Sequence, residues 1–343
     1  MDQVRVHGRR TTLALAAGLL AAVTACSGDA QPRATPTSSA AAATSSPSPS
    51  PDEPEVTRTE AAEVFAEVTL SEDVLRVKSD LQGRLGLAVD LTDGGQTRIT
   101  VADYLSTDYA PRRYTWGSPT LFVPRFEQGE GSPWFSALAT RDGRPTLLTF
   151  TRSDRWRISS AARLLPGQKL PEIEFDADGY AGAVGSDDKT VTISPQFMGP
   201  VHASVAETGT AGVTAGLIAA GPYTTEIAEQ IASRREDAKA EGFSYDSIFS
   251  ADNYPVYALR TEDGGALIQY SLSRTTTTTT RTAEDDYIPV PKSARWAIST
   301  PVLRRTLRLV ETHQYATAVP PLTAPKAAAV IAHDGALTRA TGT

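Results

Sequence analysis

Cysteine is almost absent from this sequence, because Cys26 is the only one among 343 residues. A disulfide within the chain is therefore excluded. Histidine is scarce as well, and His7, His202, His313 and His333 lie far apart along the chain. None of them stands in a spacing typical of zinc sites, such as His-Glu-x-x-His. The sequence predicts ordinary surface or core histidines and no metal or other cofactor.

Motifs of familiar enzyme classes are also missing. The chain has no Gly-x-Ser-x-Gly nucleophile elbow and no Gly-x-x-x-x-Gly-Lys-[Ser/Thr] phosphate loop. Both motifs are local in sequence because their chemistry needs a tight turn beside a strand. Their absence favours a non-catalytic protein, while a catalytic group assembled from distant residues stays an open alternative.

An excess of basic residues is lacking too. The 33 Lys and Arg residues are outnumbered by 40 Asp and Glu residues, and the net charge is −7. Nucleic acid binding needs a basic face for the phosphates, and anionic membranes attract basic segments. The composition argues against nucleic acid as a partner and against membrane binding by charge alone.

What is present begins with an export signal. Residues 1–25 contain Arg5, Arg9 and Arg10, followed by an apolar run over residues 13–23. That run is shorter than the roughly 20 residues that cross a bilayer as a helix. We expect a signal peptide, and the Arg9-Arg10 pair leaves both the general and the twin-arginine export routes open.

The signal ends in Val23, Thr24, Ala25 and Cys26. An aliphatic residue, two small residues and a cysteine in this order resemble the lipobox of bacterial lipoproteins. The resemblance implies that Cys26 becomes the N-terminus and carries lipid, and two or more acyl chains anchor a protein stably. The membrane is thus the first expected partner, and the expected location is its extracytoplasmic face.

Residues 26–56 are rich in Ser, Pro, Thr and Ala, and Val56 is their only large aliphatic residue. Such a segment buries too little apolar surface to fold. We expect a disordered tether that holds a folded body away from the membrane.

The folded body is predicted to begin with helices. Thr57 and Glu60 have the spacing of a capping box, which favours a helix N-terminus. A second helix is predicted from Ser71, with Gly83 at its C-terminus. Strands then follow, because the strand-like residues 134–140 and 146–152 flank the turn pair Asp142-Gly143, and Trp156 opens a third strand.

The second half repeats this order. A helix is predicted over residues 224–240, and residues 254–261 and 266–272 flank a second turn pair, Asp263-Gly264. The threonine run 275–280 is predicted as an edge strand or a loop, and residues 304–315 as a further strand.

These patterns predict an α+β fold with helices packed on antiparallel sheets. The two Asp-Gly hairpins favour two similar units in tandem, residues 57–190 and 191–326, before a loosely held tail at 327–343. Chance agreement between two hairpins is the alternative. A helix on a curved antiparallel sheet resembles cystatin-like and nuclear-transport-factor-like folds, and that resemblance implies nothing about function.

Alternating carboxylates occur at Glu172, Glu174, Asp176 and Asp178. In a strand, a period of two places all four on one face. We interpret them as an acidic interaction face for a cation or a basic partner, with a solvated, edge-protecting face as the alternative.

A basic counterpart surrounds Trp156, where Arg152, Arg155 and Arg157 gather. We interpret these arginines as a patch for an anionic cell-wall polymer or for the acidic face. Arginine stems that cover an aromatic surface are the alternative.

As a whole, the lipobox, the Ser/Pro/Thr-rich tether and the preference for Arg over Lys resemble actinobacterial, Streptomyces-like lipoproteins that carry an exported domain of unknown function. The predicted function is a non-catalytic binding or scaffolding module for a cell-wall polymer or an envelope protein. Capture of a small solute and hydrolysis of an envelope polymer are the alternatives, and a deep cavity would favour the first of these.

Overall fold

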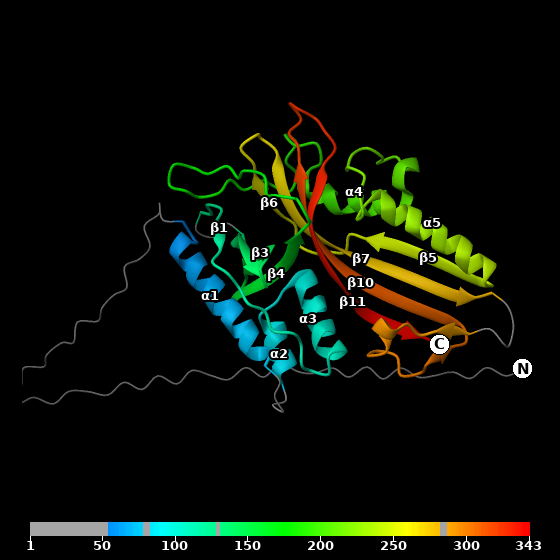
Figure 1. The fold of residues 1–343 in the computed structure, drawn as a ribbon. Helices are drawn as coiled ribbons and strands as arrows, with labels where there is room; N and C mark the ends of the chain where they lie inside the picture. Colours follow the sequence, from blue (N-terminus) through cyan, green and yellow to red (C-terminus); the bar gives the residue numbers. More distant parts are fainter. Residues whose placement is uncertain (1–53, 78–82, 128–130, 282–286) are drawn as a thin grey trace, which may run out of the picture. The chain divides into compact units, whose positions relative to one another are not determined.

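Five α-helices and eleven strands make up the part of the chain that the computed structural model describes, residues 54–77, 83–127, 131–281 and 287–343 (Figure 1). The helices are α1 (Arg58–Leu75), α2 (Arg84–Asp90), α3 (Gly94–Ser106), α4 (Pro195–Thr208) and α5 (Thr225–Ala240), with short 3-10 turns η1 (Gly209–Ala211) and η2 (Lys292–Ala294). The signal peptide, the lipobox at Val23, Thr24, Ala25 and Cys26, and most of the tether lie outside the described residues.

The strands follow in two groups. The first group is β1 (Thr120–Phe122), β2 (Trp134–Arg141), β3 (Arg144–Arg152) and β4 (Trp156–Leu164). The second group is β5 (Phe243–Ser250), β6 (Tyr257–Arg260), β7 (Ala266–Thr280), β8 (Ile288–Pro289), β9 (Val302–Leu303), β10 (Thr306–Val319) and β11 (Ala329–Gly342). The predicted α+β class is confirmed.

Nine of these strands form one antiparallel sheet in the order β1-β2-β3-β4-β11-β10-β7-β5, with β6 also paired to β7. Both predicted Asp-Gly hairpins are confirmed. Asp142 and Gly143 have φ of 53° and 75°, which is the left-handed conformation that a two-residue hairpin loop requires. In the second hairpin Leu259 pairs with Leu267, as Leu138 pairs with Leu147 in the first.

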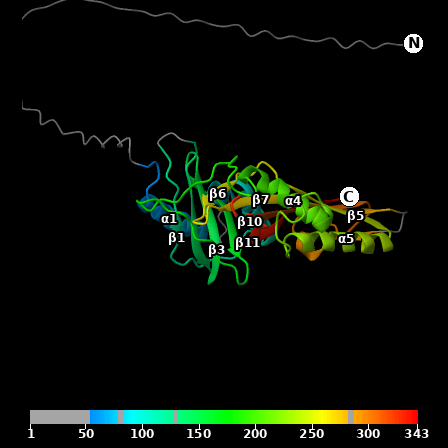
Figure 2. The same cartoon turned by 90° about the horizontal axis from the view of Figure 1, so that it is seen from above.

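The helices cover the sheet in two groups, which Figure 2 shows from above. Helix α1 packs on the strands of the first group, where Phe65 meets Phe150 edge to face. Helices α4 and α5 pack on β5 and β7 and bury Ile231 and Met198 together with Tyr270 and Tyr315. Local sequence explains α1, because the Thr57 hydroxyl accepts a hydrogen bond from the Glu60 backbone N–H at 3.0 Å, as the capping-box spacing predicts.

Two separate tandem units are not confirmed, because the described residues form a single compact unit with one shared sheet. The two strand groups also meet through buried hydrogen bonds. Gln269 on β7 accepts from Thr149 on β3 at 2.6 Å and donates to Ser136 on β2 at 2.7 Å. Buried polar groups need such partners, so these bonds tie the two groups together.

The predicted tail at 327–343 is wrong. Residues Ala329–Gly342 form β11, which lies between β4 and β10 in the sheet. Its alanines and threonines look weakly apolar in sequence, but pairing on both sides buries Ile331 and Ala332. A strand in the interior of a sheet gains its order from its neighbours more than from its own composition.

Two further predictions are corrected. The threonine run 275–280 is neither an edge nor a loop, because β7 pairs with β10 on one side and β5 on the other. The expected helix from Ser71 to Gly83 does not start there, because α1 continues through Ser71 to Leu75. Gly83, with φ of 93°, precedes α2 as its N-cap instead of ending a helix.

Candidate functional site

A cleft of about 1020 Å³, which we call the sheet cleft, lies on the second group of strands. Its floor is one face of β5, β7, β10 and β11, and one wall is the C-terminal half of α5. The segment around β8 and η2 forms the other side. In Figure 1, α5 lies along β5, and the orange segment after β8 lies beside the end of β11.

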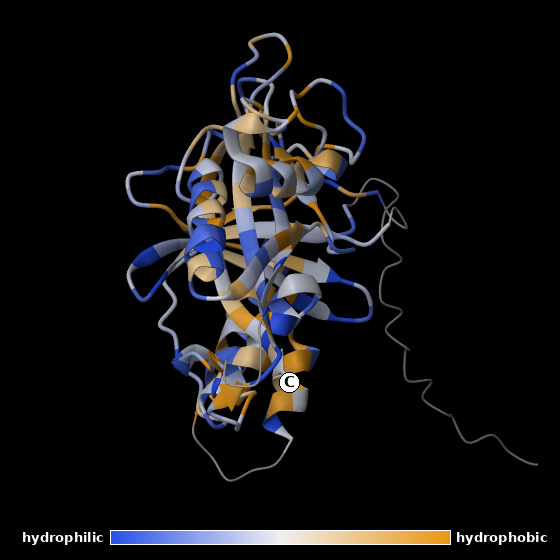
Figure 3. Cartoon of the chain, turned by 90° about the vertical axis from the view of Figure 1, so that its right-hand side faces the viewer, coloured by the Kyte–Doolittle hydropathy of each residue, from blue (hydrophilic) through white to orange (hydrophobic). Residues whose placement is uncertain are grey.

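Strand register explains why the floor is continuous. Thr276 pairs with Leu309, and Thr278 pairs with Leu307, so these side chains point to the same face. The floor is apolar over much of its area, and Phe243, Leu307, Leu309 and Leu337 belong to a cluster with Ile288. Hydrophobic stretches (orange in Figure 3) lie close to the C-terminal end of the chain, where this cluster includes Ala340.

The inner end of the sheet cleft carries polar groups. Glu311 and His313 alternate on β10, so both face the cleft, and Arg274 pairs with Glu311 across the strands. The Glu311 Oε2 atom lies 3.7 Å from Arg274 Nη1 and 3.9 Å from His313 Nε2. His313 Nδ1 then lies 3.0 Å from His333 Nε2, so one ring donates to the other.

All three histidines of the described part gather behind this end. The ring of His202 lies 4.4 Å from that of Tyr315, and the ring of His333 lies 5.0 Å from it. His202 Nε2 donates to the Tyr223 carbonyl at 2.7 Å, so its Nδ1 accepts from the Tyr270 hydroxyl at 2.6 Å. These histidines lie far apart in the sequence, and the fold brings them together.

Burial sets the protonation of this cluster. It lowers the pKa of His202 to about 4 and that of His333 to about 3, so both rings are neutral at pH 7. It also raises the pKa of Tyr270 and Tyr315 above the usual tyrosine range. Side-chain hydrogen bonding with His313 lowers the pKa of Glu311, so that carboxylate is ionised at pH 7.

The helical wall of the sheet cleft is charged. Arg234, Asp237, Ala238 and Glu241 line it, and they continue the helix face that buries Ile231 one turn earlier. The cleft therefore combines an apolar floor, a polar inner end and a charged wall. A concave site of this composition suits a small organic ligand, whose polar groups the few charged residues would orient.

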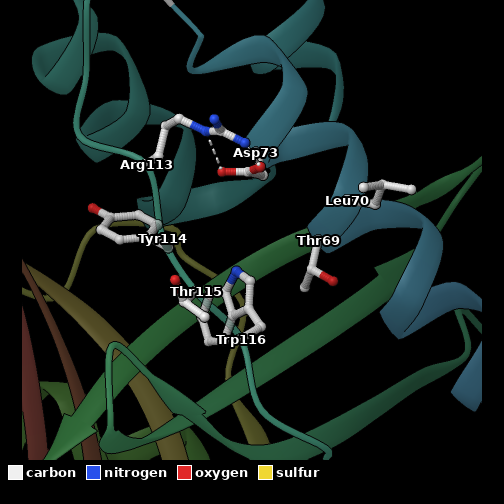
Figure 4. Close-up of a pocket in the computed structure, with 7 residues that line it drawn as sticks. All are labelled: Thr69, Leu70, Asp73, Arg113, Tyr114, Thr115 and Trp116. Carbon is white, nitrogen blue, oxygen red and sulfur yellow. Dashed lines mark hydrogen bonds and ion pairs between the residues drawn. The ribbon is translucent and has the colours of Figure 1, made fainter.

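A smaller pocket of about 590 Å³ lies beside α1 and is lined by Thr69, Leu70, Asp73, Arg113, Tyr114, Thr115 and Trp116 (Figure 4). Its charged groups already satisfy each other, because Arg113 Nε donates to Asp73 Oδ1 at 2.9 Å and a second guanidinium nitrogen reaches Oδ2. It offers a ligand fewer free polar groups than the sheet cleft does.

The structure divides the predicted acidic face. Residues 172–178 lie outside the named strands, with isolated bridges at Ile173 and Phe175. Asp176 and Asp178 both pair with Arg125, at 2.9 and 2.6 Å, and the backbone N–H of Tyr180 contributes most to lowering the pKa of Asp176. Glu172 and Glu174 precede this turn, and their joint role as an interaction face stays a prediction.

The predicted basic patch is paired within the chain. Arg152 donates to Glu55 and Glu60, both at 2.9 Å, and lies over the ring of Trp156 at 5.1 Å. Arg155 and Arg157 both pair with Asp154, at 3.4 and 2.6 Å. These arginines do not meet the acidic face, and their role in polymer binding stays a prediction.

Sequence reasoning missed the residues of the sheet cleft. Two signals for it were available in the sequence. One is the period of two in Glu311-x-His313-x-Tyr315, and the other is the helical stripe through Ile231, Arg234 and Ala238.

A Ser-x-x-Lys spacing, which some hydrolases use for catalysis, occurs at Ser186 and Lys189. It lies in an exposed turn before α4 and not on a helix that would align the two side chains.

No group of three or more His, Cys, Asp or Glu side chains in the described part of the chain is arranged to hold a metal ion. Among the same residues, no helix combines the length and the apolar character that crossing a membrane requires.

Comparison of the sequence with known proteins identifies a family and related lipoproteins. A family model described as "Domain of unknown function (DUF8094)" matches residues 52–342. An uncharacterized lipoprotein of Streptomyces coelicolor is 29% identical over 296 residues, which is 79% of each chain. An uncharacterized lipoprotein of Streptomyces avermitilis is 32% identical over 173 residues, 48% of each chain. No solved structure matches significantly. The resemblance to actinobacterial lipoproteins with a domain of unknown function is confirmed.

Proposed function

The chain belongs to the DUF8094 family. We propose that it is a lipid-anchored binding protein whose sheet cleft holds a small ligand. The uncharacterized lipoproteins among its relatives support a lipid anchor. Cys26, behind Val23, Thr24 and Ala25, is the proposed lipidation site. An exported position on the extracytoplasmic face of the membrane follows from the signal peptide that precedes it.

One observation carries the choice of ligand binding over scaffolding. The sheet cleft is concave, and it presents an apolar floor beside the polar side chains of Arg274, Glu311 and His313. Flat protein-binding faces lack such a hollow, whereas small-molecule sites combine apolar walls with a few placed polar groups.

A thermal-shift screen of small metabolites tests the proposal. A ligand that binds only the folded protein at 100 times its dissociation constant stabilises it by about 2.7 kcal/mol. The variant Leu309→Trp replaces an aliphatic side chain of the floor with a bulky indole ring and is expected to abolish the shift.

The matched control is Leu322→Trp, at a side chain that is 54% exposed outside the cleft, and it should keep the shift. A shift that survives in Leu309→Trp, or no shift with any metabolite, would contradict the proposal.

A further inference from the structure

Charge is unevenly distributed along the sheet cleft. Arg274 on the floor pairs in register with Phe249 on β5, and Arg234 stands on the stretch of α5 that packs over β5. Asp237 lies one turn further along α5, and Glu241 is the C-cap residue of that helix. The lining of the cleft thus holds two arginines, Arg234 and Arg274, and three carboxylates. Glu311 lies beside Arg274 at the inner end, whereas Asp237 and Glu241 lie toward the C-terminal end of α5, which we call the outer end.

Arg234 and Arg235 are neighbours with different environments. Arg235 points away from the cleft and pairs with Asp246 at 2.5 Å. Arg234 lines the cleft, and no hydrogen bond or ion pair with any described residue engages its guanidinium. Arg234 is exposed at the rim of the cleft, three residues after the buried Ile231, so its donors are open to solvent and to a ligand in the cleft.

Arg274 also has spare donors. Its Nε atom donates to Ser247 at 2.8 Å, whereas its contact to Glu311 is 3.7 Å, beyond hydrogen-bond distance. Its side chain is only 17% exposed, so its stem is fixed and its terminal nitrogens face the cleft. A planar guanidinium held in this way suits bidentate binding of a carboxylate or phosphate.

We propose that the ligand of the sheet cleft is an amphipathic molecule with a single anionic head, carboxylate or phosphate, bound by Arg234 and Arg274. Its apolar body lies on the floor formed by Phe243, Leu307, Leu309 and Leu337. Asp237 and Glu241 repel a second anionic group at the outer end. This inference rests on the proposed function, because it assigns a ligand class to the same cleft.

The test uses the chain from residue 27 onward, which keeps all the described residues of the compact unit and leaves out the signal peptide and the proposed lipidation site, so that no detergent is needed. Calorimetric titrations compare four probes that share a ten-carbon chain: decanoate, decyl phosphate, 1-decanol and decyltrimethylammonium. We expect the anions to bind at least tenfold more tightly than the alcohol or the cation. Decanoate and decyl phosphate separately show whether a carboxylate or a phosphate head is preferred.

Arg234→Gln should weaken anion binding roughly tenfold, the loss of one charge-assisted hydrogen bond, and leave 1-decanol unchanged. Arg235→Gln is the matched control and should change neither. Equal affinity for all four heads, or preference for the cation, would overturn the anionic assignment while leaving ligand binding in the cleft intact. Absence of binding by every probe would overturn this inference, and the metabolite screen with Leu309→Trp would judge the proposed function separately.

Discussion

The surroundings of His202 determine what that residue can do. Its two ring nitrogens are both held, one by the Tyr270 hydroxyl and one by the Tyr223 carbonyl, and its side chain is fully buried. Such a ring is a fixed hydrogen-bonding element in its neutral form and pays a desolvation cost when it is protonated. His333 is held on one side, where its Nε2 atom lies 3.0 Å from His313 Nδ1, and its ring stacks on Tyr223 at 4.0 Å.

These two histidines predict acid sensitivity. Their folded pKa values, about 4 and about 3, lie below the ordinary value of 6.5. The unfolded chain therefore binds protons first, and stability that is complete above pH 6.5 is lost as pH falls toward the folded values. Urea unfolding should show a free energy of unfolding lower by about 2 kcal/mol per histidine at pH 5 than at pH 7.

The variant His333→Gln should lose part of this pH dependence, because it removes one titrating ring. A free energy of unfolding that is equal at pH 7 and pH 5 would contradict the assignment of both histidines as buried and neutral.

Thr57 carries the other prediction at this scale. Thr57→Ala removes the hydroxyl that caps α1 and should lower the free energy of unfolding by about 1 kcal/mol. Thr59→Ala, on the exposed side of the same helix, is the control and should cost little. If both variants have the same stability in urea titrations, Thr57 is not a functioning cap.

Among the elements, α3 shows a limit of local sequence. Its first residues, Gly94 and Gly95, are poor helix formers, and no helix is predicted there. The structure gives the reason for Gly95, because a Cβ atom there would lie 2.5 Å from the Ser271 hydroxyl oxygen. Close approach of α3 to β7 needs glycine, and sequence pattern alone does not reveal such a distant neighbour. The hairpins were predictable because their turn chemistry is local.

Gly95→Ala is therefore expected to destabilise the protein, although alanine is the better helix former. Gly86→Ala in α2 is the matched control, because nothing lies within 4 Å of its Cβ position, and it should stabilise by up to about 1 kcal/mol. The double variant Gly95→Ala with Ser271→Gly should recover stability. Thermal melts that rank Gly95→Ala above the parent protein would contradict the close contact.

For the whole molecule, β11 is the element that joins the two strand groups. It pairs with β10 along most of its length and with β4 through Ala332 and His333. It also supplies His333 to the sheet cleft. The fold class was predictable from periodicity, but this joining strand and the cleft were not, because both depend on pairing between residues far apart in sequence.

Removal of residues 327–343 tests this role. We expect the truncated chain to lose cooperative thermal unfolding, because β4 and β10 would both lose their neighbour and the buried side chains of β11. Circular dichroism melts of the full and truncated chains provide the measurement. A truncated chain that melts as sharply and at the same temperature as the parent would show that β11 is dispensable.

Ligand binding in the sheet cleft is the central claim, and hydrogen–deuterium exchange with and without decanoate tests it most directly. The account predicts slower exchange in β7, β10 and the C-terminal half of α5, with no change in α1 or in residues 113–116 beside the smaller pocket. Protection confined to α1 and residues 113–116, or no protection anywhere under conditions where a ligand is bound, would contradict it.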